Sequence, residues 1–232
     1  MVKTMQNIRD YILQQIGITL SANEENAFST YCEFLLAENE KYNLTAITDP
    51  AEVWEKHFAD SLLGCEFLPQ NAAVCDVGSG AGFPALPLKI VRKDISVTLV
   101  DSLEKRVNFQ KMLCDKLDIE AEFFHSRAED FAKTHSECFD VATARAVAPL
   151  PILLEYTAQL VKLGGTVVAY KTDDAELASA ANACKVLGLT FKTSKRFTLP
   201  NGGNRAILVF EKTAHTPAKY PRGQNKPRKQ PL

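Results

Sequence analysis

The sequence lacks any hydrophobic run that approaches the roughly 18 residues needed to cross a membrane. Its N-terminal residues alternate apolar with polar and charged side chains, unlike the apolar core of a signal peptide. The six cysteines are scattered, with no C-x-x-C pair that would predict a zinc site or a disulfide framework. These absences predict a cytoplasmic chain with reduced cysteines, no membrane contact and no bound metal. Nothing in the sequence indicates an obligate dimer, so a monomer is expected.

Charge is unevenly distributed along the chain. The formal net charge of the 232 residues is −1, yet residues 214–232 hold five basic side chains and no acidic one. The rest of the chain therefore has 22 basic against 28 acidic residues. The tail is rich in proline and glycine, so we expect it to be disordered alone and to contact RNA or DNA phosphates. Lys219 and Arg222 are candidates for these contacts, and a merely solubilising terminus is the alternative.

Hydrophobic periodicity divides the chain into a helical part and an α/β part. Residues 1–65 are expected to be a helical extension, with a capping box at Ser21 and Glu24 and a helix start at Asp49. From residue 72, short β-rich runs alternate with helical stretches, which predicts a mostly parallel sheet covered by helices on both faces. The runs on either side of NGGN (residues 201–204) predict a hairpin with an antiparallel last strand. This Rossmann-like, seven-stranded layout over residues 66–213 is typical of class I methyltransferases.

The stretch VCDVGSGAGFPALPL (residues 74–88) places three glycines between a strand and a helix. Glycines there allow the backbone to pass close to a ligand, and a simple tight turn is the alternative. No G-K-[ST] follows, which excludes a Walker phosphate loop, and a dinucleotide site requires G-x-G-x-x-G. The observed G-x-G-x-G after Asp76 resembles an S-adenosylmethionine loop, with Gly78 and Gly80 as candidate cofactor contacts.

Two further strand ends complete this candidate cofactor site. Asp101 ends the next strand, where a carboxylate can accept both ribose hydroxyls of a nucleoside, although it could instead cap the following helix. The segment Ser126–Asp130 follows the third strand, where an adenine ring is usually held. Because the carboxyl ends of parallel strands meet at one rim of the sheet, the three pieces together predict S-adenosylmethionine binding.

The segment TARAVAPLP (residues 143–151) limits the acceptor chemistry. It lacks the [ND]-P-P-[FYW] loop of adenine amino methylation and the cysteine that methylation of a pyrimidine carbon needs. It carries Arg145, and Lys171 ends the next strand; neither is a general base. An acceptor with a free lone pair, such as guanine N7, fits this absence, since positioning is then the main requirement. Arg145 and Lys171 are the candidates for that positioning, with surface ion pairs as the alternative.

The sequence resembles the bacterial 16S ribosomal RNA guanine-N7 methyltransferases, also called the glucose-inhibited division protein B family. The resemblance extends from about residue 30 to the end of the last strand. It rests on these motifs: YNLT (42–45), HFADS (57–61), DVGSGAGFP (76–84), DSLEKR (101–106), SRAE (126–129), ARA (144–146) and YK (170–171).

The resemblance implies that Gly78, Phe83, the Ala128–Glu129 pair and Arg145 contact S-adenosylmethionine, and that the substrate is a guanine in 16S rRNA of the 30S subunit. Asp101 is implied for the ribose by the general class I pattern. The sequence departs from the family pattern at three positions. Ala85 and Thr172 stand where the family has glycine, and Ala144 stands where it has serine. These changes put in doubt the flexibility of a loop glycine and one hydroxyl contact.

Several polar residues remain open to two interpretations. His57 with Asp60 and Ser61 could close the cofactor pocket, contact RNA or form a polar packing cluster, and Asn43 could contact RNA or bond its own backbone. Two other functions also remain open. One is methylation of a different acceptor, and the other is an RNA-binding assembly factor built on a methyltransferase fold.

Overall fold

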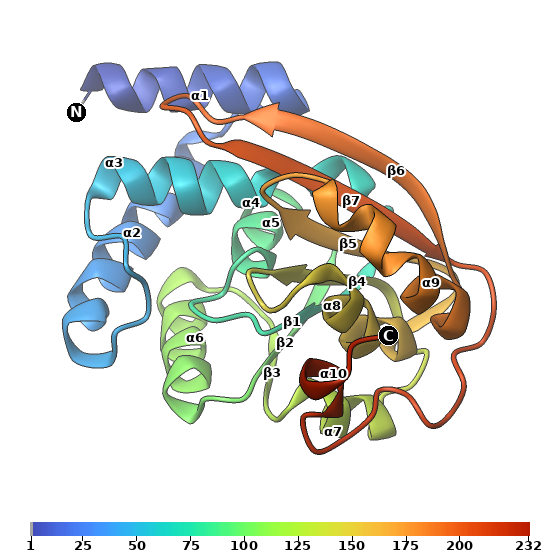
Figure 1. Cartoon of the computed structure of the whole chain (residues 1–232). Coiled ribbons are helices and arrows are strands. Elements are labelled where there is room, and N and C mark those ends of the chain that lie inside the picture. Colours follow the sequence, from blue (N-terminus) through green and yellow to red (C-terminus); the bar gives the residue numbers. More distant parts are fainter. Residues whose placement is uncertain (1) are drawn as a thin grey trace.

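The computed structural model describes residues 2–232, with side chains from Gln6 onward, and confirms the expected α/β architecture (Figure 1). One sheet contains seven strands in the order β3-β2-β1-β4-β5-β7-β6. The first five strands pair in parallel, whereas β7 is antiparallel to both β5 and β6, so the predicted hairpin is present. The strand bounds are β1 (Ala73–Val77), β2 (Ser96–Asp101), β3 (Glu122–His125), β4 (Phe139–Arg145), β5 (Val161–Lys171), β6 (Leu189–Thr198) and β7 (Asn204–Lys212).

Helices cover both faces of the sheet. Successive strand residues point to opposite faces, so Val74 belongs to one hydrophobic cluster and Cys75 to the other. The first cluster is closed by α5 (Ala85–Val91) and α6 (Glu104–Leu117) together with the N-terminal helices. The second is closed by three helices: α7 (Ala128–Thr134), α8 (Leu150–Thr157) and α9 (Ala181–Leu187).

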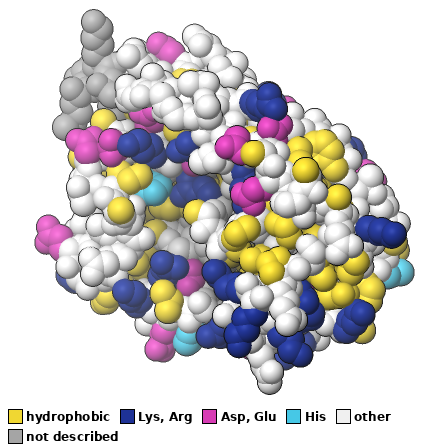
Figure 2. Space-filling model, in the orientation of Figure 1, with side chains coloured by type: hydrophobic (Ala, Val, Ile, Leu, Met, Phe, Trp, Pro, Cys, Tyr) yellow, Lys and Arg dark blue, Asp and Glu magenta, His cyan; other side chains and the backbone are white. Residues whose placement is uncertain are grey.

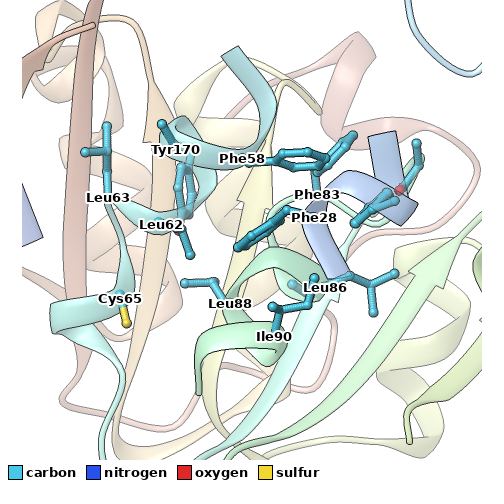
Figure 3. Close-up of a cluster of buried hydrophobic side chains, with 14 of the residues drawn as sticks. Phe28, Phe58, Leu62, Leu63, Cys65, Phe83, Leu86, Leu88, Ile90 and Tyr170 are labelled. Atoms are coloured by element: carbon cyan, nitrogen blue, oxygen red, sulfur yellow. Dashed lines mark hydrogen bonds between the residues drawn. The ribbon is translucent and has the colours of Figure 1, made fainter. Parts of the chain in front are cut away.

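The N-terminal helices share the core of the sheet. They are α1 (Val2–Ile16), α2 (Ala22–Tyr42), α3 (Pro50–Val53), the π-helical η1 (Trp54–Ala59) and α4 (Asp60–Leu62). The capping box of Ser21 and Glu24 and the Asp49 cap form as expected. Phe28 and Phe58 pack against Phe83 and Leu86 of the glycine stretch (Figure 3). The boundary near residue 65 therefore marks a change of structure without a separate core. No helix of residues 2–232 is long and apolar enough to span a bilayer.

The helix that begins at Asp49 is not regular, which the sequence did not predict. Across η1, the Asp60 N–H donates to the carbonyl of Glu55, five residues earlier. This wider turn changes the face that a regular spacing would give to His57 and Asp60. The wider turn also leaves backbone carbonyls of Lys56 and His57 available to accept from Arg145.

The C-terminal tail is ordered, and this corrects the expectation of disorder. Residues 213–232 cross the second face of the sheet and end in the short helix α10 (Lys226–Lys229) beside α8 and α7 (Figure 1). Thr216 and Tyr220 are buried, and the Thr216 hydroxyl donates to the carbonyl of Leu187 at 2.7 Å. Composition predicted disorder because the tail has few apolar residues, but it buries Tyr220 and two prolines, Pro221 and Pro227.

Candidate active site

A cavity of about 230 Å³ lies at the carboxyl ends of β1, β2 and β3. Gly78, Asp101, Ala128 and Glu129 line it, so the structure brings together four of the predicted cofactor contacts. The remaining walls come from residues after β4 and from α8 and α10. A larger hollow of about 490 Å³ between α2 and α5 lacks these strand-end groups and sits away from the glycine stretch. The strand-end cavity is therefore the candidate ligand site.

The glycine stretch needs glycine at its first position. Gly78 has φ +69°, and a Cβ there would lie 2.7 Å from Cγ2 of Val147. Its N–H donates to the carbonyl of Val100 at 2.8 Å, which holds the loop against the end of β2. A side chain at this position would have to displace Val147, which also lines the cavity. The bare backbone keeps this wall of the cavity open.

Asp101 lines the cavity, and it is not the N-cap of α6, because that position is held by Leu103 without a side-chain cap. Its Oδ2 accepts from the Gly80 N–H at 2.9 Å and its Oδ1 from the Leu103 N–H at 2.9 Å. Arg106 approaches Oδ2 at 3.4 Å. A carboxylate oxygen has more than one acceptor site, so both oxygens retain capacity for the hydroxyl groups of a ribose. Asp101 thus fixes the glycine loop while facing the ligand site.

Glu129 places a carboxylate at the wall of the cavity. It lies in the first turn of α7 and is only 5% exposed. Its carboxylate forms no hydrogen bond and no ion pair with any other described residue. Its oxygens are not among the buried side-chain atoms without a partner, so a ligand in the cavity can reach them with its donors. This orphaned carboxylate fits a nucleoside, which offers hydroxyl and amino donors.

Arg145 lies next to the cavity, in a polar cluster with the N-terminal helices. Its Nη1 donates to Asp60 at 3.0 Å, and its Nη2 donates to Nδ1 of His57 at 3.1 Å. The guanidinium carbon lies 4.9 Å from the centre of the Phe83 ring. Asp60 also accepts from Arg205 at 3.0 Å. Arg145 thus joins the end of β4 to η1, and it does not itself line the cavity.

His57 is neutral and fully engaged. Because arginine only donates, Nδ1 of His57 must accept from Arg145, which leaves the proton on Nε2 to donate to Thr45 at 2.8 Å. Burial and then the Arg145 charge lower the pKa of His57 to about 3. The ring stacks on Phe83, with centroids 4.4 Å apart, and Tyr31 stacks on Phe83 at 5.3 Å. Of the alternatives for His57, the polar packing cluster agrees best with these contacts. Phe83 packs against the rings of His57 and Tyr31.

Asp76 carries the most strongly perturbed carboxyl group near the loop. It is fully buried, and its Oδ1 accepts from the Thr143 hydroxyl at 2.7 Å. Its Oδ2 has no partner among the described residues. Burial raises the pKa of Asp76 to about 7, against the opposing effect of the Thr143 hydrogen bond. The group therefore lies behind the glycine stretch, where it can take up or release a proton near neutral pH.

Four of the predicted substrate contacts have partners within the chain. Asn43 adopts the left-handed conformation that ends α2, and its N–H bonds to the carbonyl of Asn39. Lys171 pairs with Glu176 and donates to the Ala148 carbonyl, both at 2.9 Å. Arg222 forms an ion pair with buried Glu155 at 2.7 Å. Lys219 is exposed and lies over the Tyr220 ring.

Sequence reasoning missed several residues of the site. Arg205, Tyr156, Asn225 and Arg228 gave no motif signal, because each reaches the site from a distant part of the chain. Glu155 was visible as a lone acid in the apolar helix LPILLEYT, which indicates a buried ion pair. Figure 2 shows Lys and Arg side chains gathered on the lower part of one face, over α7 and α10.

Comparison with known proteins gives the family. A family model described as GidB, rRNA small subunit methyltransferase G, matches residues 24–204. The ribosomal RNA small subunit methyltransferase G of Streptococcus gordonii is 44% identical over 229 residues, which cover 95% of this chain and 97% of that relative. The chain belongs to this family. The resemblance recognised from its motifs is therefore confirmed.

Solved structures show the same fold at low identity. A SAM dependent methyltransferase from Aquifex aeolicus is similar with a TM-score of 0.53 and 17% identity, covering 72% of this chain and 96% of that one. A ribosomal protein L11 methylase from Lactobacillus delbrueckii subsp. bulgaricus gives a TM-score of 0.53 at 20% identity, covering 68% and 79%. Together with the family, they identify the chain as an S-adenosylmethionine-dependent methyltransferase.

The residues at the strand-end cavity fit this cofactor. Two observations agree with a bound nucleoside. The Glu129 carboxylate has no partner among the described residues, and Gly78 has no side chain that would push Val147 toward the cavity. No group of three or more His, Cys, Asp or Glu side chains suited to a metal occurs within residues 6–232. The site residues that the described chain offers are thus oxygen acceptors, backbone amides and guanidinium groups.

Proposed function

We propose that this chain transfers the methyl group of S-adenosylmethionine to N7 of a guanine in 16S rRNA of the small ribosomal subunit. The observation that carries the proposal is the polar cluster next to the cavity, in which every titratable group is engaged. His57 uses both ring nitrogens, and Asp60 accepts from two arginines. Outside this cluster, Lys171 at the end of β5 is paired with Glu176. This cluster contains no free general base.

The acceptor chemistry agrees with that arrangement. S-adenosylmethionine, when bound, supplies a methyl group on a positively charged sulfur. Guanine N7 carries a lone pair and no hydrogen, so the protein has no proton to remove from the attacking atom. The work left to the chain is to hold the base still and aligned, which by itself can supply a large part of the rate enhancement.

The cofactor is assigned to the cavity residues. Asp101 accepts from the ribose hydroxyls, and Glu129 with the backbone of Ala128 holds the nucleoside. The backbone of Gly78 and Gly80 passes beside it without a side chain. Phe83 and Arg145 act as positioning residues, because they support the loop and the end of β4 from the cluster behind. Lys171 fixes the loop before α8 through the Ala148 carbonyl.

The RNA target must expose its Hoogsteen edge. In an A-form helix N7 faces a deep, narrow groove, so the guanine lies in a loop or is flipped out. Arg106 and Arg127 at the cavity rim, with the exposed lysines of the tail, contact phosphates. The chain acts as a monomer on the 30S subunit or its rRNA, and therefore in the cytoplasm.

The test is a methylation assay with purified protein and labelled S-adenosylmethionine. Unmethylated 30S subunits and naked 16S rRNA are the acceptors, and the digested RNA is searched for 7-methylguanosine by mass spectrometry. We expect one modified guanine, and none with the Gly78→Ala protein, whose cavity is narrowed. Methyl incorporation at another atom, or in neither acceptor, would reject guanine N7 in 16S rRNA as the target.

A further inference from the structure

The C-terminal segment is attached to α8 by one strong buried ion pair. The Arg222 backbone N–H and Nε–H donate to Oε1 of Glu155 at 2.9 and 2.8 Å, and Nη2 donates to Oε2 at 2.7 Å. Glu155 has no exposed side-chain surface, so Arg222 supplies the charge that this carboxylate requires. Two parallel N–H to oxygen bonds also fix the orientation of the guanidinium group.

The same arginine fixes the chain on both sides of α10. Its Nη2 also donates to the carbonyl of Gln230 at 2.8 Å, just after α10 ends. Pro227 is buried within α10, and Tyr220 is buried before it. The four residues of α10 are therefore held between contacts at residue 222 and residue 230. We call residues 220–230 the C-terminal strap.

The strap forms one wall of the cofactor cavity. Asn225 and Arg228 line the cavity together with Asp101, Glu129 and Tyr156. Arg228 donates through Nη2 to the carbonyl of Val147 at 3.0 Å. The side chain of Val147 lies where a Cβ at Gly78 would be. Val147 therefore contacts both Arg228 and the glycine stretch.

We propose that Arg228 is a cofactor-binding residue that contacts the adenosine part of S-adenosylmethionine, and that Arg222 is the positioning residue that holds it there. The inference rests on the proposed placement of adenosine between Asp101 and Glu129. It assigns the inward side of the strap to the cofactor. The outward lysines remain available to RNA.

The chemistry of arginine suits this position. The Arg228 guanidinium donates to the Val147 carbonyl and lies within reach of the Tyr156 hydroxyl, and its five N–H groups leave further donors at the cavity wall. Adenine and ribose present ring nitrogens and hydroxyl oxygens as acceptors, and a planar guanidinium can also stack on a purine. The same cavity carries the carboxylates of Asp101 and Glu129, which accept rather than donate. Donors from the strap and acceptors from the strand ends are complementary contacts for one nucleoside.

Calorimetry with two ligands tests the assignment of Arg228. S-adenosylhomocysteine carries the whole nucleoside and amino acid, and 5′-methylthioadenosine carries only the nucleoside. We expect Arg228→Ala to weaken both ligands by the same factor of about 10, as for the loss of one charge-assisted contact. The matched control is Lys229→Ala, the adjacent exposed residue of α10, which should change neither affinity by more than about twofold.

Three results would overturn the assignment. Arg228→Ala could bind both ligands like the wild type, or it could weaken S-adenosylhomocysteine alone, which would place Arg228 at the amino acid end. It could also lose RNA affinity to the same extent as Lys229→Ala with no change for either nucleoside, which would give the residue to RNA. The two nucleoside titrations need no RNA, so their results are separate from a failure of rRNA methylation, and RNA affinity is measured in a separate titration. A wild type that binds neither ligand would remove the cofactor site and this inference with it.

Limited trypsin digestion tests the positioning role of Arg222. Ligands that contact the strap stabilise its closed position, so 5′-methylthioadenosine should slow cleavage within residues 219–230 of the wild type by about tenfold. Arg222→Lys keeps the charge but loses the paired bonds, and we expect faster cleavage that saturating ligand reverses. The positioning role of Arg222 would be refuted by either of two results. Ligand could fail to slow the cleavage of Arg222→Lys, or it could fail to protect the wild type. The strap would then be a structural element without a role in cofactor binding.

Discussion

Asp76→Asn should remove a pH dependence from the stability of this protein. The Asp76 carboxyl is fully buried, with one oxygen bonded to Thr143 and the other unpartnered among the described residues. Burial raises its pKa from 3.8 to about 7. Between these two values the folded protein keeps a proton on Asp76 that the unfolded chain has released. The contribution of this group is therefore fully favourable below pH 3.8, and it is lost as pH rises toward 7.

The size of the effect follows from the shift. Each pH unit between the two pKa values lowers the free energy of unfolding by about 1.4 kcal/mol, because the folded state binds one proton more than the unfolded state. Integrated from pH 5 to pH 8, the loss is about 2.5 kcal/mol. An asparagine cannot titrate, so the stability of Asp76→Asn relative to the wild type should rise by that amount. Any fixed cost of the amide cancels in this difference.

Urea unfolding at pH 5, 6, 7 and 8 measures the difference directly. His57, whose pKa is lowered to about 3, titrates in both proteins and cancels from the comparison. Asp115→Asn, at an exposed position of α6, is the control for loss of one carboxylate. A difference between Asp76→Asn and wild type that stays constant from pH 5 to pH 8 would falsify the reasoning. It would show that Asp76 is ionised throughout, with Arg145 as the nearby charge that compensates for burial.

Three further predictions follow from the site. Gly78→Ala should cost about 1 to 2 kcal/mol of stability, from the positive φ and the contact with Val147, and abolish cofactor binding in calorimetry. Arg145→Ala should cost about 3 kcal/mol in urea unfolding, since Asp60 keeps only one arginine, and turnover should fall at saturating cofactor. Unchanged turnover would remove its positioning role. Replacing three exposed tail lysines by alanine should reduce the salt slope of RNA binding by about 2 to 3 and leave cofactor affinity unchanged: Lys219, Lys226 and Lys229.

The parts of the fold that depend on local chemistry were predictable from the sequence. The capping box at Ser21 and the Asp49 cap formed because each satisfies backbone N–H groups within three residues. The mostly parallel sheet was implied by the alternation of strands and helices, and its antiparallel end by the NGGN turn. Gly78 and Asp101 were predictable for the same reason, because the ends of parallel strands meet at one rim.

The polar cluster around Arg145 was not predictable, because it depends on contacts between distant segments. Arg145 was expected to contact the cofactor, and the structure commits its guanidinium to His57 and Asp60, more than 80 residues earlier. Arg205, from the hairpin, shares Asp60 with it. The π-helical turn that frees carbonyls for this arginine leaves no signature in residue spacing. A charged residue at a strand end therefore indicates that a site lies nearby. It does not indicate whether the side chain contacts the ligand or the surrounding protein.

The tail shows a different limit of sequence reasoning. Disorder was expected because composition counts the apolar area that a segment carries, and this segment carries little. Its order depends on what the rest of the chain leaves unsatisfied. Helix α8 buries Glu155 without any local cation, and a buried carboxylate without a partner is strongly unfavourable. Arg222 supplies that partner, and burial of Tyr220 and Pro227 completes the attachment. A lone acid in an apolar helix should therefore prompt a search for its cation, even in a segment that composition would classify as disordered.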